Sequence, residues 1–211
     1  MNNLDSLRSD FNKDWNSVGV YHGKGLVADL PSWEDVLGIL NNAARDKDPQ
    51  VNQSIKASAP FEIIYKDMLA NKTIRYDKED INIFDVESEV TFFFSLFFNQ
   101  DTFGSVISES VKNQTLELDK LLNIKSEYSS LKISIADKFV PYESHEWDTC
   151  ILHLAGTTEW RLKGGTHGAE KLYVLEPGDI LLFKEGVEHE LTNEKPRSSL
   201  VGRFILGDSH E

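Results

Sequence analysis

The stretch EPGDILLFKEGVEHELTN, residues 176–193, decides the fold. Pro177-Gly178 marks a turn that leads into the apolar run ILLF, and Gly186 supports a second tight turn. His189 follows three residues later, at the start of the next strand-like segment. The pattern predicts turn, strand, turn and strand, with His189 aimed inward at the beginning of the second strand.

The sequence pattern around this stretch predicts the fold class. From about residue 131, short β-rich runs follow one another at close spacing, separated by turns that contain glycine, proline or asparagine. The runs are LKISIADKFV, DTCILHLAG, TEWRLKG, KLYVLEPGD, DILLFKEG and SSLVGRFIL. Many short strands with such turns are typical of a small antiparallel barrel or jelly roll. We expect a mainly β fold in this half of the chain.

The first half of the sequence is mixed. A helix is expected over 32–46, where Ser32 can cap an apolar stripe, and 114–124 has weak helical character. The apolar runs at 61–69 and 91–98 are compatible with strand or helix, because periodicity does not decide short runs. We therefore predict a mixed α/β region over 1–128 packed on a barrel over 129–211, or a single domain overall.

Charge and cysteine content exclude several classes of function. The 211 residues carry 22 Lys and Arg against 35 Asp and Glu, a net charge of −13, which argues against binding nucleic acid or an anionic membrane. The one cysteine, Cys150, excludes a disulfide framework and a thiolate zinc site. The N-terminus is too polar for a signal peptide, and the run at 90–98 is too short to span a membrane. We expect a cytoplasmic protein.

The spacing around His189 resembles a known motif. Gly178, five residues, Lys184, one residue, Gly186, two residues, His189, three residues and Asn193 match the second cupin motif, with lysine where proline is usual. Counting back from Gly156, the ligand pair of the first cupin motif falls on Glu143 and His145. Side chains two apart on a strand share a face, so this pair could hold one ion together with His189. Two imidazoles and one carboxylate suit Fe(II) with open positions, and also Zn, Mn, Ni or Co.

Residues 131–206 also resemble the JmjC-like cupins, the group that includes the 2-oxoglutarate-dependent protein hydroxylases. The resemblance rests on WDTCILHLAGTTEWRL and LEPGDILLFKEGVEHE. Glu143-Ser144-His145 stands where that family has His-x-Asp, Thr158 occupies the usual position of the Lys or Arg that holds 2-oxoglutarate, and Thr149 replaces a common cupin glutamate. The resemblance implies a double-stranded β-helix with Fe(II) and 2-oxoglutarate. Thr149 and Thr158 are then the best-placed polar contacts to the cosubstrate, and Arg203 is the replacement cation.

Several nearby side chains leave alternatives open. His153 is an even number of residues from His145, so on a regular strand the two side chains would share a face. It could therefore be a fourth ligand, an acid–base group or a core histidine whose ring nitrogens are both hydrogen-bonded. Asp148 could replace Glu143 as the carboxylate of the site, or act as a hydrogen-bonding support. Cys150 alternates away from the ligand face. Trp147 and Trp160 are interpreted as barrel packing.

These residues support three functional hypotheses. The first is a metal-dependent oxygenase, a JmjC-like hydroxylase of a protein, peptide or small molecule. The second is a lyase, isomerase or cosubstrate-free dioxygenase that uses the metal as a Lewis acid and His153 as the base. The third is a degenerate cupin that binds a ligand or partner without a metal. Homodimerisation is expected only by analogy with related cupins.

Overall fold

The computed structural model describes residues 4–36, 38, 107–134, 138–163, 170–193 and 196–207, and also three strands between residues 63 and 97. Its elements are α1 (Leu4–Val18), β1 (Val20–Gly23), β2 (Ile63–Asp67), β3 (Lys72–Tyr76), β4 (Phe93–Phe97), α5 (Glu109–Leu122), β5 (Ile124–Ser134), β6 (Lys138–Glu143), β7 (Thr149–Ala155), β8 (Thr158–Lys163), β9 (Lys171–Leu175), β10 (Ile180–Phe183), β11 (Glu188–Asn193) and β12 (Arg197–Leu206). Among the helices of these ranges, none is long and apolar enough to cross a membrane.

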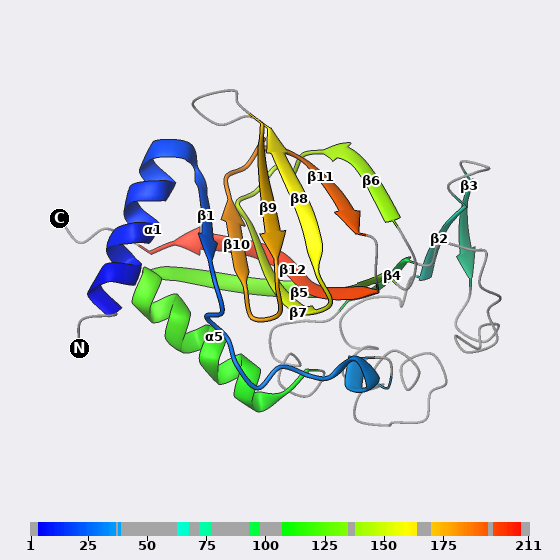
Figure 1. Cartoon of the computed structure of the whole chain (residues 1–211), viewed down its shortest axis with the longest axis horizontal. Coiled ribbons are helices and arrows are strands. Elements are labelled where there is room, and N and C mark those ends of the chain that lie inside the picture. The colour runs from blue at the N-terminus through cyan, green and yellow to red at the C-terminus, as the bar shows by residue number, and fades with distance from the viewer. Residues whose placement is uncertain are drawn as a thin grey trace.

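Two antiparallel sheets form the barrel. The larger sheet has the order β1-β10-β7-β12-β5-β4, and the smaller sheet has the order β6-β11-β8-β9 (Figure 1). From β5 to β12 the chain passes back and forth between the two sheets, and only β8 and β9 follow each other within one sheet. This winding is a double-stranded β-helix, so the predicted jelly-roll fold class is confirmed.

Both faces of the larger sheet are buried, against different partners. One face looks toward the smaller sheet, and an inner cluster that includes Ile151, Trp160, Leu162, Phe183 and Leu191 fills the space between them. The other face is covered by α1 and α5, which lie outside the barrel (Figure 1). Side chains alternate across a strand, so β7 is buried at every position.

The helix-side cluster between the larger sheet and the helices settles the orientation of β7. Cys150, Leu152 and Leu154 belong to this cluster, together with Phe11 and Trp15 of α1. Cys150 therefore points away from the inner face, as predicted. Burial raises the pKa of its thiol well above the ordinary value, which makes it a poor nucleophile.

The remaining predictions of secondary structure are met to different degrees. The ambiguous runs at 61–69 and 91–98 contain the strands β2 and β4. The weak helical segment is α5, which begins earlier than expected because the Ser108 hydroxyl accepts a hydrogen bond from Val111 N–H. The helix expected over 32–46 begins as predicted, since Ser32 Oγ accepts from Asp35 N–H at 3.1 Å, but residues beyond 38 lie outside the described part.

The predicted division at 128/129 stays a prediction. The first part of the chain contributes β1 and β4 to the larger sheet, where β1 pairs with β10 and β4 pairs with β5. It also contributes α1 and α5, which cover that sheet.

Candidate metal centre

Glu143 and His189 are brought together by the pairing of β6 with β11. The two residues are direct register partners, and a β-bulge follows between His189 and Leu191. Glu143 is the last residue of β6, and His189 is the second residue of β11. The Glu143 side chain is 56% exposed, whereas that of His189 is 2% exposed. The pair therefore runs from the barrel interior to its surface.

His145 reaches the same place from a loop. The sequence predicted that Glu143 and His145 would share one face of a strand, but β6 ends at Glu143, so this part of the prediction is wrong. Two hydrogen bonds tie the loop to the turn before β11: Gly186 N–H donates to His145 O at 2.9 Å, and Glu185 N–H donates to Asp148 Oδ1 at 2.9 Å. The turn thus holds His145 in position.

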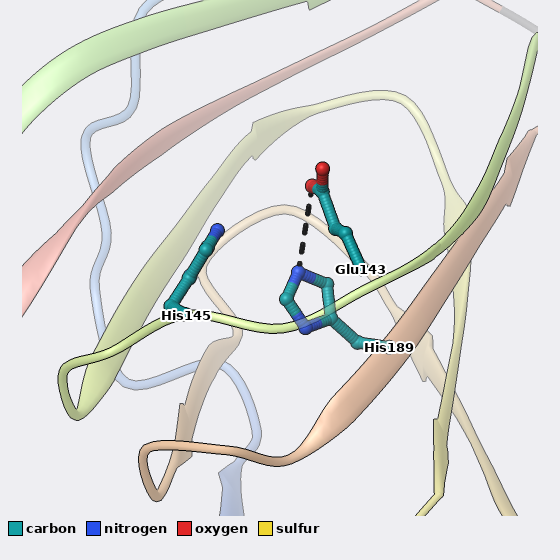
Figure 2. A group of neighbouring side chains, drawn as sticks. All are labelled: Glu143, His145 and His189. Carbon is teal, nitrogen blue, oxygen red and sulfur yellow. Dashed lines mark ion pairs between the residues drawn. The ribbon is translucent and has the colours of Figure 1, made fainter.

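The three side chains form a compact donor group, called the triad below. One donor atom from each of Glu143, His145 and His189 lies within 4.8 Å of the others. His189 Nε2 is 3.5 Å from Glu143 Oε1, and the two imidazole rings are 4.7 Å apart at 67° (Figure 2). Ligands bound to one ion at about 2.1 Å lie about 3 to 4 Å apart, so a small closure would suffice.

A backbone carbonyl sets the tautomer of His189. Its Nδ1 lies 3.1 Å from Val187 O, which can only accept, so Nδ1 carries the hydrogen. Nε2 then presents a lone pair toward Glu143, and within the described residues this buried atom has no hydrogen-bond partner. A lone pair facing a carboxylate is unfavourable unless a cation lies between them. A proton or a divalent metal ion satisfies this arrangement.

A hydroxyl sets the tautomer of His145 in the same way. Thr149 Oγ1 donates its hydrogen to Trp147 O at 3.3 Å, so it accepts from His145 Nδ1–H at 2.8 Å. His145 Nε2 is left as an acceptor facing the triad. The Trp147 ring stacks on His145 at 5.1 Å and 15°. Trp147 is 48% exposed, so its interpretation as barrel packing is wrong, whereas Trp160 does lie in the inner cluster.

The electrostatics favour the protonation states that bind metals. When His189 carries a proton on Nε2, its contact with Glu143 is the main cause that lowers the pKa of Glu143, and nearby positive charge lowers it further. Burial is the main cause that lowers the pKa of His145. At neutral pH the triad therefore offers a carboxylate and a neutral imidazole from these two residues. Phe183 lies beneath both imidazoles, with ring centroids 5.0 Å from His189 and 6.5 Å from His145.

The sequence left open whether Glu143 or Asp148 is the carboxylate of the site. In the structure Asp148 makes hydrogen bonds that support the loop. Its Oδ1 accepts from the turn at Glu185, and its carbonyl oxygen accepts from Phe204 N–H at 3.0 Å. Among the described residues, the group of potential metal ligands contains Glu143 and not Asp148.

The structure does not bring His153 to the triad. It lies on the same inner face of β7 as Thr149 but four residues further along, about 13 Å of strand rise. Its Nδ1 is 2.9 Å from Ser199 Oγ and its Nε2 is 3.0 Å from Gly156 O. Both nitrogens are engaged, and burial lowers the pKa of His153 to about 4. These are the contacts of a core histidine, and its catalytic role remains a prediction that its position does not support.

The residues predicted to hold a cosubstrate are also separated. Thr149 is at the triad, but its hydroxyl is used to orient His145. The Thr158 hydroxyl donates to Thr192 O at 3.2 Å, four residues along β8 from Leu162, the register partner of His189. Arg203 is largely exposed and donates from Nε to Glu127 Oε2 at 2.8 Å. Arg203 is therefore engaged at the surface and is not placed as the replacement cation.

Of two further side chains near the triad, Lys132 was missed from the sequence and Trp160 was interpreted only as barrel packing. Lys132 of β5 contributes positive charge at both Glu143 and His145. Trp160 of β8 places its ring 5.7 Å from His189. The alternation Leu131-Lys132-Ile133 was visible, but it reads equally well as a strand with a solvated face. Only the helices that cover Leu131 and Ile133 show that Lys132 faces the other sheet.

Comparison with known proteins agrees with this fold. No family model and no curated protein match the sequence. Among solved structures, a prolyl-4-hydroxylase of Pseudomonas putida is similar with a TM-score of 0.51 at 12% identity, covering 96% of this chain and 100% of that one. YcfD, a ribosomal oxygenase of Escherichia coli, is similar with a TM-score of 0.53 at 16% identity, covering 94% of this chain and 51% of that one.

A cupin superfamily protein of Desulfitobacterium hafniense is also matched, at a TM-score of 0.36 and 17% identity, over 58% of this chain and 84% of that one. At such identities the two fuller matches show a shared fold and do not establish a reaction. The jelly-roll fold inferred from residues 131–206 is confirmed by the two fuller matches.

Proposed function

We propose that this chain is a metal-dependent enzyme of the cupin fold, an Fe(II) oxygenase acting on a protein, peptide or small molecule. The observation that carries the proposal is the triad itself. Two imidazole Nε2 atoms and one carboxylate converge, and each imidazole is already held through its Nδ1. Three protein donors leave coordination positions for other ligands, as oxygenases with two histidines and one carboxylate require.

The residues fit a divalent metal by charge and by chemistry. His189 Nε2 is buried and faces Glu143, and a cation between them would resolve this contact. A metal ion held there would supply a Lewis acid and, as iron, a redox centre for oxygen chemistry. The chain's own part is to fix both imidazoles, to supply the neutralising carboxylate and to exclude water with Phe183 and Trp160. The solved structures of similar fold that are named as a hydroxylase and an oxygenase support this choice.

The two alternatives differ in what they need from the structure. A lyase or isomerase with His153 as base needs a free ring nitrogen near the triad, and both nitrogens of His153 are engaged elsewhere. A metal-free binding module does not explain why the three side chains of the triad, all of types that bind metals, converge at one place. The oxygenase accounts for this convergence, so it is preferred.

The test is oxygen consumption by protein reconstituted anaerobically with Fe(II) and supplied with 2-oxoglutarate. We expect slow turnover without substrate in the wild type and its loss in Glu143→Gln. The control is Glu146→Gln, an exposed glutamate in the neighbouring loop that lies outside the triad. Bound iron without any oxygen uptake would exclude this oxygenase and direct attention to Lewis-acid chemistry.

A further inference from the structure

The turn between β10 and β11, residues 184–187, holds both imidazoles of the triad. Gly186 N–H donates to His145 O at 2.9 Å, and His189 Nδ1 lies 3.1 Å from Val187 O. The first contact places the loop that carries His145, and the second sets the tautomer of His189. A displacement of this turn would therefore move two of the three candidate ligands.

Lys184, the first residue of this turn, is bound to the segment that joins α1 to β1. Its N–H donates to Gly19 O at 3.0 Å, and its Nζ lies 5.2 Å from the centre of the Trp15 ring. The stem of the side chain passes so close that a Cβ at Gly19 would come 2.8 Å from Lys184 Cδ. The second cupin motif usually has proline at this position, and proline has no N–H to donate. The lysine therefore makes a backbone contact that the usual residue cannot make.

Trp15 also reaches the loop that carries His145. Its ring lies 5.1 Å from the ring of Phe204, at 63°, and Phe204 N–H donates to Asp148 O at 3.0 Å. Asp148 belongs to that loop, and its Oδ1 accepts from Glu185 N–H of the turn. Both aromatic rings are buried in the helix-side cluster. Trp15 therefore contacts one residue that supports the turn and another that supports the loop.

We propose that Trp15 is a positioning residue of the triad, through which the packing of α1 on the larger sheet sets the affinity for the metal. Contact with Lys184 holds the turn, and contact with Phe204 holds the loop. Because buried side chains are close-packed, a change at one of them moves its neighbours. The chain runs from α1 directly into β1, which pairs with β10, the strand before the turn (Figure 1). The inference rests on the proposed function, because it concerns the metal of that site.

The test compares Trp15→Leu with Leu122→Ala, using Co(II) alone as the probe. Leu122 belongs to the same cluster and is buried, but it lies on α5, so its loss lowers stability without touching α1. We expect Trp15→Leu to weaken Co(II) binding about tenfold to a hundredfold and to change the visible absorption spectrum of the bound ion. Leu122→Ala should keep the affinity and the spectrum of the wild type. Trp15→Phe retains an aromatic ring and should restore most of the affinity.

A second pair of variants tests the backbone contact, and it keeps the inference testable if Trp15→Leu does not fold. Lys184→Pro removes the N–H that donates to Gly19 O, so Co(II) binding should weaken about tenfold. Lys184→Met keeps this N–H and the apolar stem, and should bind Co(II) nearly as the wild type does. Equal affinity in Lys184→Pro and the wild type would show that the contact with Gly19 does not position the turn.

The wild type separates this inference from the proposed function. If it binds Co(II), and Trp15→Leu has the same affinity and spectrum or is weakened no more than Leu122→Ala, the inference is overturned and the metal site stands. If the wild type binds no metal, the metal-dependent function fails, and the imidazole ¹⁵N signals of His145 then test the positioning. A shift of these signals in Trp15→Leu but not in Leu122→Ala would support it, and their constancy would overturn it.

Discussion

One hydroxyl decides how His145 is presented. Thr149 donates to Trp147 O and can then only accept from His145 Nδ1–H, which turns Nε2 toward Glu143 and His189. The common cupin pattern has glutamate at this position. Here the position holds a threonine whose hydroxyl orients His145, a candidate metal ligand.

Replacing Thr149 with valine removes this acceptor at nearly constant shape. We expect Thr149→Val to weaken metal binding about tenfold to a hundredfold, measured by competition with a chromophoric chelator. Thr149→Ser keeps the hydroxyl and should stay close to the wild type. Equal affinity in Thr149→Val and Thr149→Ser would mean that the hydroxyl does not orient His145.

The burial of His153 predicts that the stability of the fold depends on pH. Its pKa is lowered by burial from 6.5 to about 4, so the unfolded chain binds the proton more readily. The stability from this residue is fully present above pH 6.5 and is lost as the pH falls toward 4. Between pH 7 and pH 5 the wild type should lose about 2 kcal/mol of unfolding free energy through His153.

The matching variant is His153→Gln, which cannot titrate. Urea unfolding at both pH values should show a smaller loss in this variant, by about the same 2 kcal/mol. A loss identical to that of the wild type would show that His153 is not the buried neutral group that the structure places there.

At this scale the sequence predicted the triad but not its surroundings. Glu143, His145 and His189 were identified by the spacing within two short motifs, and the pairing of β6 with β11 brings these motifs together. The place of Arg203 depends on Glu127 of β5, 76 residues away, and that of Lys132 depends on which face the helices cover. Such relations require the strand register and the layer arrangement, which no motif contains.

At the scale of elements, the loop after β6 and the turn before β11 act as one unit. Glu185 N–H donates to Asp148 Oδ1, and Gly186 N–H donates to His145 O. Gly186 has a positive φ of 72°, which glycine adopts without strain. The second cupin-like motif therefore holds His189 and also fixes the loop that carries His145.

Asp148→Ala should loosen this unit without removing a ligand. We expect metal affinity to fall about tenfold, because the loop loses one hydrogen bond to a charged acceptor while the triad keeps its three donors. Asp148→Asn retains an acceptor oxygen and should bind metal nearly as the wild type does. Complete loss of metal in both variants would identify Asp148 as a ligand and contradict its supporting role.

Elements were predictable where the pattern was long or repeated. The succession of strands after residue 131 followed from turns and apolar runs. The end of β6 at Glu143 did not, because the hydrogen bonds between the loop and the turn override the alternation expected for a continuous strand. Runs such as 91–98 became strands through pairing with distant partners, which their composition does not reveal.

At the scale of the whole molecule, the N-terminal segment is joined to the turn that precedes β10. Leu26 N–H and Val27 N–H donate to Gly178 O, at 2.9 and 3.2 Å. His22 Nε2 lies 2.9 Å from Asp179 Oδ2. Gly178 has φ 91°, and a Cβ there would come 2.4 Å from Val27 O. The Pro177-Gly178 turn is thus one of the contacts between the first part of the chain and the barrel.

Gly178→Ala tests this contact against Gly25→Ala. Both glycines have positive φ, but a Cβ at Gly25 would meet nothing within 4 Å. We expect a loss of about 1 to 2 kcal/mol of unfolding free energy for Gly25→Ala, and about 1 to 3 kcal/mol more for Gly178→Ala, measured by urea denaturation. Equal losses would show that the close approach to Val27 is absent.

The most direct test of the metal centre is metal content after anaerobic reconstitution with Fe(II), by elemental analysis. We predict about one equivalent per chain in the wild type. Binding should be lost in His189→Ala and Glu143→Ala and retained in His153→Gln and Glu146→Ala, which leave the triad intact. A wild type without metal, or equal binding in all five proteins, would contradict the account.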